Sequence, residues 1–261
     1  MEKVSAAIRK VVKSLSTSKG RRNEHAFVTE RTKNVLELLN SSFRLRWLIA
    51  GNLWFESHKE LHVDSGKCLI ATRADMERMT SLNTPSEVIA VFELPEAPTD
   101  IIFHKSKLYL ALDAIQDPGN LGTIIRLADW FGVDTILAGA GTVDAFNPKC
   151  IISSMGSISR VKVFECNLEK TIATARHEGL NIWGTFMDGT SIYDIDSNQR
   201  SGGIIVMGNE GNGISPHIAE LVSKRITIPS FPPGSEGPES LNVAMATAII
   251  LSEFRRTLLQ N

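Results

Sequence analysis

The feature that most constrains the fold is a pair of strand-to-loop transitions in the last third of the chain. In the first, Gly203–Gly213, the apolar run Ile204–Met207 ends abruptly in a glycine-rich stretch. In the second, Ile226–Ala246, a short strand breaks at Pro229 into a loop rich in proline and glycine. Loops at the carboxyl ends of parallel strands are where α/β sheets bind ligands. The pair therefore predicts a parallel α/β sheet with a ligand site at one edge.

Glycine lets backbone amides approach a ligand closely, because no side chain stands in the way. One glycine-rich loop alone is equally typical of a plain tight turn. Here the second loop also closes on the polar sequence Ser240-Leu241-Asn242, directly before an apolar helical pattern. Two such loops close together favour a binding function over two unrelated turns.

Three motifs in this region resemble those of the SpoU (TrmH) family of RNA methyltransferases, which belongs to the SPOUT class. They are Asn120-Leu-Gly122-Thr-Ile-Ile-Arg126, Gly208-Asn-Glu-Gly-Asn-Gly213 and, after Ile228-Pro229, Ser240-Leu241-Asn242-Val243-Ala244. They occur in the family's order. The resemblance implies methyl transfer from S-adenosylmethionine to a ribose 2′-hydroxyl of structured RNA, with ribosomal RNA favoured over transfer RNA. It also implies a homodimer and a C-terminal domain tied in a trefoil knot, a rare exception among folds.

The alternation of short apolar runs with helical patterns predicts an α/β protein with two domains. Residues 108–261 are expected to form the methyltransferase domain, a doubly wound parallel sheet that begins with Leu108–Leu112. Residues 1–94 are expected to form a small α/β domain for RNA substrate binding, and 95–107 the linker and domain entry. Phe27-Val28-Thr29-Glu30 and Val88–Phe92 resemble a ribosomal-protein-like domain found in many family members, although Arg31 stands where the family usually has glycine.

Motif positions imply two sets of site residues. The catalytic set is Asn120, Arg126, Glu210, Ser240 and Asn242, and the cofactor set is Thr185, Gly208, Ile228 and Leu241. In the family the arginine is proposed as the base that removes the hydroxyl proton. A guanidinium stays protonated in almost any protein setting, so a bond from Arg126 to a phosphate or to the developing alkoxide is the alternative.

Each of these residues also has a structural explanation. Ser240 and Asn242 precede an apolar helix, where both residue types are preferred as N-caps. Glu210 is expected to order its loop near the site, and outside a motif it would be a surface carboxylate. Arg126, predicted in the first or second turn of its helix, would otherwise be a surface charge. The role of the long segment 230–239 stays open between walling the cofactor pocket and contacting RNA.

Composition narrows the remaining possibilities. The net charge of −1 gives no global attraction to RNA, but seven cations against two acids in residues 1–24 predict a basic helix face that is either solvated or in contact with phosphate. Neither a membrane span nor a zinc or disulfide pattern is found, which predicts a cytosolic protein with reduced cysteines and no metal.

Two rival functions differ from the methyltransferase hypothesis. A nicotinamide dehydrogenase would carry Gly-x-Gly-x-x-Gly in an early βαβ unit, whereas the glycines here follow a late strand with different spacing. An RNA-binding protein that has lost catalysis would keep the fold, and the intact Asn120, Arg126, Ser240 and Asn242 argue against it.

Overall fold

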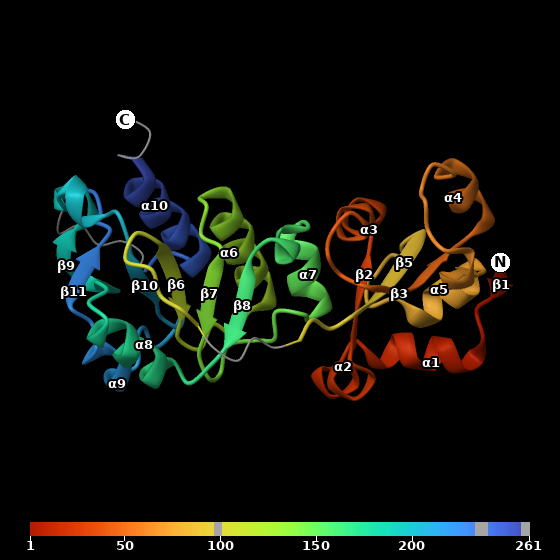
Figure 1. Cartoon of the computed structure of the whole chain (residues 1–261), viewed down its shortest axis with the longest axis horizontal. Coiled ribbons are helices and arrows are strands. Elements are labelled where there is room, and N and C mark those ends of the chain that lie inside the picture. Colours follow the sequence, from red (N-terminus) through yellow and green to blue (C-terminus); the bar gives the residue numbers. More distant parts are fainter. Residues whose placement is uncertain (97–100, 233–239, 257–261) are drawn as a thin grey trace. The chain divides into compact units, whose positions relative to one another are not determined.

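A computed structural model describes residues 1–96, 101–232 and 240–256, and its contacts divide the chain into two compact units (Figure 1). Unit 1 combines Met1–Glu96 with Asp144–Ser159, and unit 2 contains the described residues 101–143 and those from Arg160 onward. The chain therefore leaves unit 2 after Val143 and returns at Arg160. The domain bounds 1–94 and 108–261 stay a prediction, from which this grouping differs in the segment 144–159.

Unit 1 is a five-stranded mixed sheet in the order β1-β4-β3-β5-β2, with β5 antiparallel to both neighbours. Its strands are β1 (Glu2–Lys3), β2 (Ala26–Glu30), β3 (Leu45–Ala50), β4 (Cys68–Ile70) and β5 (Val88–Glu93). Its helices are α1 (Ala6–Ser14), α2 (Ser18–Glu24), α3 (Thr32–Leu39), α4 (Asn52–Ser57), α5 (Arg73–Met79) and α7 (Pro148–Ser154). The sequence pattern predicts helices over Thr32–Leu39 and Pro148–Ser154, the bounds of α3 and α7, but it does not indicate α4.

Successive side chains of a strand point to opposite faces of the sheet, and unit 1 has a core on each face. On one face, Val28, Ile89 and Val91 pack with α1 and α5 residues such as Val12 and Met76. On the other face, Phe27 lies within ring-contact distance of Phe43, Phe92 and Phe146, with centroids 4.9 to 5.6 Å apart. Aromatic burial therefore joins the segment around Phe146 to the N-terminal sheet.

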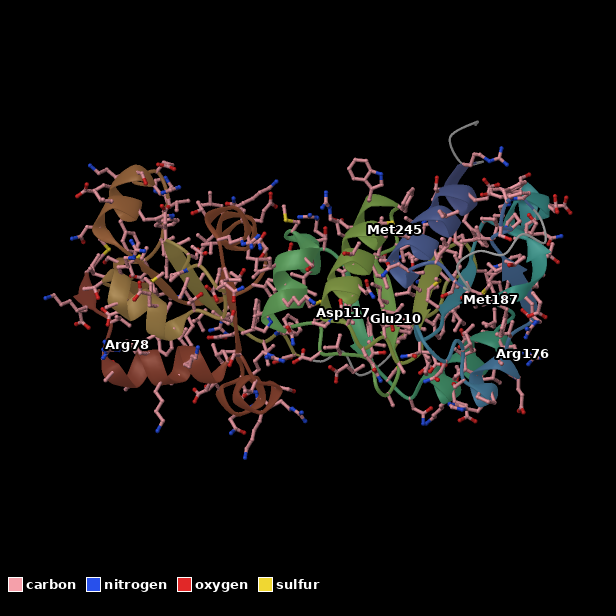
Figure 2. The ribbon with its side chains drawn as sticks, turned by 180° about the vertical axis from the view of Figure 1, so that it is seen from behind. Arg78, Asp117, Arg176, Met187, Glu210 and Met245 are labelled. Atoms are coloured by element: carbon pink, nitrogen blue, oxygen red, sulfur yellow. The ribbon has the colours of Figure 1, made fainter. Side chains whose placement is uncertain are left out.

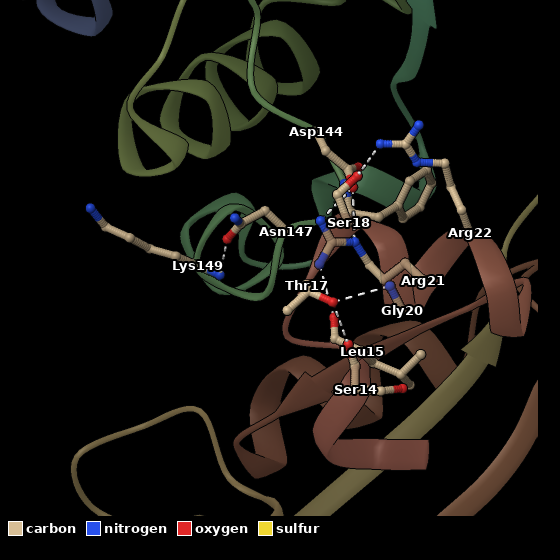
Figure 3. A network of polar contacts seen from close by, with 11 residues as sticks. Ser14, Leu15, Thr17, Ser18, Gly20, Arg21, Arg22, Asp144, Asn147 and Lys149 are labelled. Atoms are coloured by element: carbon tan, nitrogen blue, oxygen red, sulfur yellow. Dashed lines mark hydrogen bonds and ion pairs between the residues drawn. The ribbon is translucent and has the colours of Figure 1, made fainter. Parts of the chain in front are cut away.

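An ion pair between buried Arg21 and partly exposed Asp144 fastens the same segment to α2 (Figure 3). Arg21 is 2% exposed, donates from Nε and Nη2 to Asp144 Oδ2 at 2.8 and 2.5 Å, and donates from Nη1 to the Leu15 carbonyl at 2.8 Å. Cys150 and Ile151 of α7 are also buried. These contacts explain why residues 144–159 belong to unit 1 although they lie between two strands of unit 2.

Unit 2 is a six-stranded sheet in the order β11-β9-β10-β6-β7-β8, and every pairing in it is parallel. Its strands are β6 (Leu108–Leu112), β7 (Thr135–Ala138), β8 (Lys162–Glu165), β9 (Ile182–Ser191), β10 (Gly203–Met207) and β11 (Lys224–Thr227). Its helices are α6 (Pro118–Trp130), α8 (Leu168–His177), α9 (Pro216–Ala219) and α10 (Val243–Arg256). In Figure 1, α6 and α10 lie on one face of the sheet and α8 and α9 on the other, which confirms the predicted parallel α/β fold.

Short 3-10 turns complete the described elements, at Ser65–Lys67, Ser157–Ser159, Ile192–Asp194 and Ser197–Gln199. Three sequence-based details differ from the structure. The sequence pattern predicts helices over Leu241–Leu258 and Pro216–Val222. In the structure Leu241 and Asn242 precede α10, and α9 ends at Ala219. Arg126 is the ninth residue of α6, so it lies in the third turn and not in the first or second.

Candidate active site

The candidate site lies at the carboxyl edge of the unit 2 sheet. The chain runs from β6 to β8 on one side and places β9, β10 and β11 on the other, so β6 and β10 flank the point where the strand order reverses. The loop after β6 leads to Asn120, the loop after β10 contains Glu210, and the chain after β11 leads to Asn242. In open α/β sheets this switch point is the usual ligand position.

Hydrogen bonds tie the three motifs together there. Asn120 donates from Nδ2 to Glu210 Oε1 at 2.8 Å and accepts at Oδ1 from Asn242 Nδ2 at 3.1 Å. The Asn120 backbone N–H also donates to Asp117 Oδ1 at 2.8 Å, which caps α6. Figure 2 shows Asp117 and Glu210 together at this edge. We call Asn120, Glu210 and Asn242 the polar cluster.

Asn242 caps α10, as expected from the sequence, and it also contacts Asn120 of the polar cluster. Its Oδ1 accepts from the backbone N–H groups of Ala244 and Met245 at 3.0 and 3.3 Å, which caps α10, while its Nδ2 reaches Asn120. The cap fixes the side-chain amide and therefore aims its remaining donor at the cluster. Ser240 makes no hydrogen bond to another described residue and is exposed.

The loop after β10 is closed on itself. Asn209 and Gly213 exchange backbone hydrogen bonds of 2.9 Å, and Asn209 Oδ1 accepts from the N–H groups of Gly211 and Asn212. A Cβ at Gly208 would lie 2.3 Å from the carbonyl carbon of Gly213, and Gly213 has a φ of +68°. Both glycines are therefore needed to form the loop itself, whatever the loop binds.

Two residues that the motif argument did not select hold this loop against β6. Asp113 is buried, and its Oδ2 accepts from both the backbone N–H and the hydroxyl of Ser215 at 2.7 Å. Asn209 Nδ2 donates to the Ala114 carbonyl at 2.8 Å. The sequence signal for Asp113 was its place directly after the apolar strand Leu108–Leu112, at the edge where polar residues meet.

Arg126 stands apart from the polar cluster. It is exposed and makes no hydrogen bond or ion pair with another residue of the described ranges. It lies six residues beyond Asn120, about 9 Å further along α6. Its guanidinium is therefore available for a contact beyond the described residues.

The residues predicted to hold the cofactor surround the same edge. Thr185 in β9 donates from its hydroxyl to the Val206 carbonyl of β10 at 3.0 Å. Ile228 follows β11 and is partly buried, whereas Leu241 is an exposed apolar side chain, 51% accessible, next to Asn242. Most of the segment 230–239, considered as a pocket wall or an RNA contact, lies outside the described residues.

Three of the seven cations of the basic N-terminal stretch make contacts within unit 1. Arg9 pairs with Asp75 at 2.8 Å, Lys13 Nζ donates to the Thr80 carbonyl at 3.0 Å, and Arg21 is buried against Asp144. Of these three, Arg21 is buried and cannot reach a phosphate, whereas Lys13 remains exposed. Among residues 1–96, 101–232 and 240–256, no cluster of His, Cys, Asp and Glu suits a metal ion, and no helix is long and apolar enough to span a membrane.

Comparison with known proteins decides the family. A profile described as the SpoU rRNA Methylase family matches residues 107–252, and one described as the MRM3-like substrate binding domain matches residues 7–90. The chain belongs to the SpoU rRNA methylase family. It is 32% identical over 244 residues to the 23S rRNA (guanosine(2553)-2′-O)-methyltransferase RlmP of Bacillus subtilis, covering 93% of this chain and 94% of that protein.

Solved structures of the family have the same fold over nearly the whole chain. A putative TrmH-family RNA methyltransferase from Porphyromonas gingivalis superposes with a TM-score of 0.85 at 36% identity, covering 97% of this chain and 99% of its own. An AdoMet-bound rRNA methyltransferase from Sinorhizobium meliloti superposes with a TM-score of 0.85 at 28% identity, covering 99% and 97%.

Proposed function

We propose that this protein methylates the 2′-hydroxyl of a ribose in ribosomal RNA, with S-adenosylmethionine as the methyl donor. The observation that carries the proposal is the pair of hydrogen bonds that joins Asn120 to Glu210 and to Asn242, because it gathers the three family motifs at one edge of the sheet. Membership of the SpoU family and the similarity to an rRNA guanosine 2′-O-methyltransferase support the same reaction.

The residues at this edge fit S-adenosylmethionine. Gly208 has no side chain, Ile228 and Leu241 are partly accessible apolar side chains, and the cluster beside them is polar. This combination suits a ligand with an apolar ring and polar ends. We propose that Gly208, Ile228 and Leu241 hold the cofactor, with Thr185 beside them, and that it supplies an electrophilic methyl group.

The chain's own contribution is to position the ribose and to stabilise charge. Arg126 can donate charge-assisted hydrogen bonds to the phosphate next to the target ribose, or to the oxygen as its proton leaves. The polar cluster orders the loop that carries Glu210, while Ser240 stays accessible to the substrate. We assign Asn120, Arg126, Glu210, Ser240 and Asn242 to the catalytic set in these roles.

The direct test is transfer of a labelled methyl group from S-adenosylmethionine to unmodified ribosomal RNA and, separately, to transfer RNA. Nucleoside digestion then locates the label. We expect a 2′-O-methylated nucleoside from ribosomal RNA. Label on a base would contradict the proposal, and cofactor binding without transfer to either RNA would favour the non-catalytic RNA-binding alternative.

We further propose that the protein acts as a homodimer that brings Arg126 of one chain to the polar cluster of its partner. α6 and α10 run side by side in the same direction, because Asn242 contacts Asn120 at one end and Arg255 donates to the Phe131 carbonyl at the other. Trp130 and Met245 on these helices are 82% and 61% exposed. Arg126 lies four residues before Trp130, on the same helix face.

Complementation tests the shared site. Mixing Arg126→Ala chains with Asn242→Ala chains should restore about a quarter of the wild-type activity if random exchange assembles one intact site in half of the dimers. Equal failure of the mixture and of each variant alone would mean that each site is built within one chain.

Three further expectations remain proposals. The C-terminal knot rests on family resemblance. Action in the cytoplasm is supported by Cys68, Cys150 and Cys166, which form no disulfide and so suit a reducing compartment. The division at residues 94 and 108, with RNA binding by the first part, should be tested with point variants, because deleting 1–94 would remove the sheet on which Phe146 packs.

A further inference from the structure

Unit 1 contains two adjoining cavities of about 450 and 440 Å³ that share Arg31, Leu82 and Asn83. One extends along the loop to Ser86. The other is walled by the start of the inserted segment, including Asn147 and Lys149. We call the two cavities together the Arg31 groove. It lies within unit 1, and it is separate from the candidate active site in unit 2.

The backbone of Arg31 is held in an unfavourable conformation. Its φ is +73°, a region in which side chains other than glycine are uncommon and which costs about 1 kcal/mol or more. This explains why glycine is the residue expected here from the family resemblance. A bulky cation at such a position is a reason to look for a function that needs its side chain.

The surrounding loop is fixed at both ends by Arg31 and its neighbour. Buried Glu30 accepts hydrogen bonds from Thr80 and from the backbone and hydroxyl of Ser81, at 2.5 to 2.8 Å. The backbone N–H of Arg31 donates to the Ser86 hydroxyl at 2.8 Å. The loop from Ser81 to Ser86, which borders the groove, is therefore anchored at both of its ends.

The groove has the charge of an anion site. The residues that line its two cavities include two cations, Arg31 and Lys149, together with hydroxyl and amide side chains, and include no carboxylate. Arg31 is exposed, and its guanidinium makes no hydrogen bond or ion pair with any residue that the structure describes. A guanidinium matches the geometry of a phosphate oxygen pair, and the polar side chains beside it suit a sugar-phosphate chain.

We propose that the Arg31 groove binds the phosphate backbone of the RNA substrate, with Arg31 as the main contact. The inference rests on the proposed function, which supplies RNA as the ligand. It goes beyond the match to a substrate-binding domain over residues 7–90, because part of the groove wall is the inserted segment with Asn147 and Lys149. RNA bound in the groove would contact residues from both segments of unit 1, Met1–Glu96 and Asp144–Ser159.

Arg31→Gly in the full-length protein is a sharp test, because glycine accepts the positive φ and removes only the side chain. RNA affinity, measured with an unmodified ribosomal RNA transcript, should fall by about tenfold. The slope of log affinity against log salt should become shallower by about 0.7 to 0.9, as expected for one lost phosphate contact. The melting temperature and the affinity for S-adenosylmethionine should not fall.

Arg78→Ala is the matched control, since it removes an exposed cation of α5 that does not line the groove (Figure 2). It should leave RNA affinity within twofold of the wild type. Asn83→Asp should weaken RNA binding in the same direction as Arg31→Gly, because it places a carboxylate in the groove.

The inference would be overturned if Arg31→Gly bound RNA with the same affinity and salt slope as the wild type. It would also be overturned if Arg78→Ala lost as much RNA affinity as Arg31→Gly. The proposed function is judged separately, by methyl transfer from the wild type to ribosomal RNA. A wild type that methylates while Arg31→Gly binds RNA normally would refute the groove alone. A wild type that transfers no methyl group would refute the proposed function.

Discussion

In unit 2, Glu210 and Asn242 lie 90 and 122 residues after Asn120 in the chain, and both form hydrogen bonds with its side-chain amide. In unit 1, by contrast, the groove loop is anchored by the adjacent residues Glu30 and Arg31, and its far wall comes from a segment inserted between two strands of the other sheet. The first arrangement depends on specific residue types at three fixed positions. The second depends on packing and on backbone conformation.

The difference teaches which kind of site can be read from a single sequence. A site assembled from residue types in a fixed order leaves motifs. A surface assembled by packing leaves no motif in the sequence. Here its one sign is Arg31, at a position where the family resemblance predicts glycine. Four experiments test the interactions that stabilise these two regions, two in each unit.

The largest effect is expected in unit 1, from breaking the ion pair of Figure 3. Arg21→Ala leaves Asp144 without its partner and removes the bond to the Leu15 carbonyl. We expect a loss of about 3 kcal/mol in the free energy of unfolding of unit 1. Urea unfolding followed by tryptophan fluorescence would measure it, with Trp47 and Trp54 reporting on unit 1 and Trp130 and Trp183 on unit 2.

The neighbour Arg22 provides the control for this change. It is exposed and bonds the Ser18 hydroxyl within its own helix. Arg22→Ala should cost less than about 0.5 kcal/mol. Equal losses from the two variants would mean that the inserted segment is not held by this ion pair.

The next effect concerns the polar cluster of unit 2. Asn120→Asp replaces the donor that faces Glu210 with a second carboxylate, so we expect the rate of methyl transfer to fall about 100-fold at neutral pH. One proton shared by the two carboxyl groups would restore a donor. Single-turnover rates should therefore recover partly as the pH is lowered, and a loss that does not depend on pH would contradict this reason.

A smaller effect is expected from removing the hydrogen bonds between Asp113 and Ser215, which lies after the β10 loop. Asp113→Ala removes both bonds from Ser215 and should weaken S-adenosylmethionine binding by about tenfold, whereas Ser215→Ala removes only the hydroxyl bond and should weaken it less. The double variant should be little worse than Asp113→Ala alone, because that change already removes both bonds. Isothermal titration would measure the affinities. Additive losses would show that the two residues act independently.

Asp188→Asn serves as the control for that pair. Asp188 is an exposed carboxylate that pairs with Arg225 in the same unit. We expect no measurable change in cofactor affinity, because exposed ion pairs contribute little.

The smallest effect is expected at the capping box of α5. Bonds from Thr72 hold the pKa of Asp75 below its usual range, with a further contribution from Arg9. The folded pKa lies below the unfolded one, so this stabilisation is present above the unfolded pKa and is lost as the pH falls through the folded pKa. Asp75→Ala should cost about 1 kcal/mol at neutral pH and progressively less below about pH 4.

Glu77→Ala, on the same helix, is the comparison for Asp75. Glu77 is 52% exposed and pairs only with Arg73 among the described residues. Its replacement should change thermal stability by less than about 0.5 kcal/mol. A flat difference between Asp75→Ala and the wild type over pH 2 to 7 would contradict the capping explanation.

Much of unit 2 could be predicted from the sequence. The sequence pattern predicts strands over Leu108–Leu112, Thr135–Ala138 and Gly203–Met207 and a helix over Leu168–His177. The structure has all four at these bounds, because buried parallel strands are uniformly apolar and helices begin at caps. The family, the reaction and the cofactor followed from motifs and are confirmed by the comparisons. The roles of the individual site residues stay predictions.

What could not be predicted depends on contacts between distant residues. The apolar pattern of Cys150 and Ile151 indicated a helix, but it could not indicate which sheet that helix covers. The cations Arg9, Lys13 and Arg21 formed one basic run in the sequence, and only the folded chain shows their partners Asp75, Thr80 and Asp144. Asp113 belonged to no motif element that the sequence argument used, so its bond to Ser215 was missed.

The most direct test of the central claim compares the wild type with Arg126→Ala in transfer of labelled methyl from S-adenosylmethionine to unmodified ribosomal RNA. Arg126 is exposed and lacks a partner among the described residues, so its replacement should leave folding and cofactor affinity unchanged. We expect label on a ribose 2′-oxygen with the wild type and none above background with the variant. Equal ribose labelling by both proteins would contradict the assignment of this edge as the site of methyl transfer.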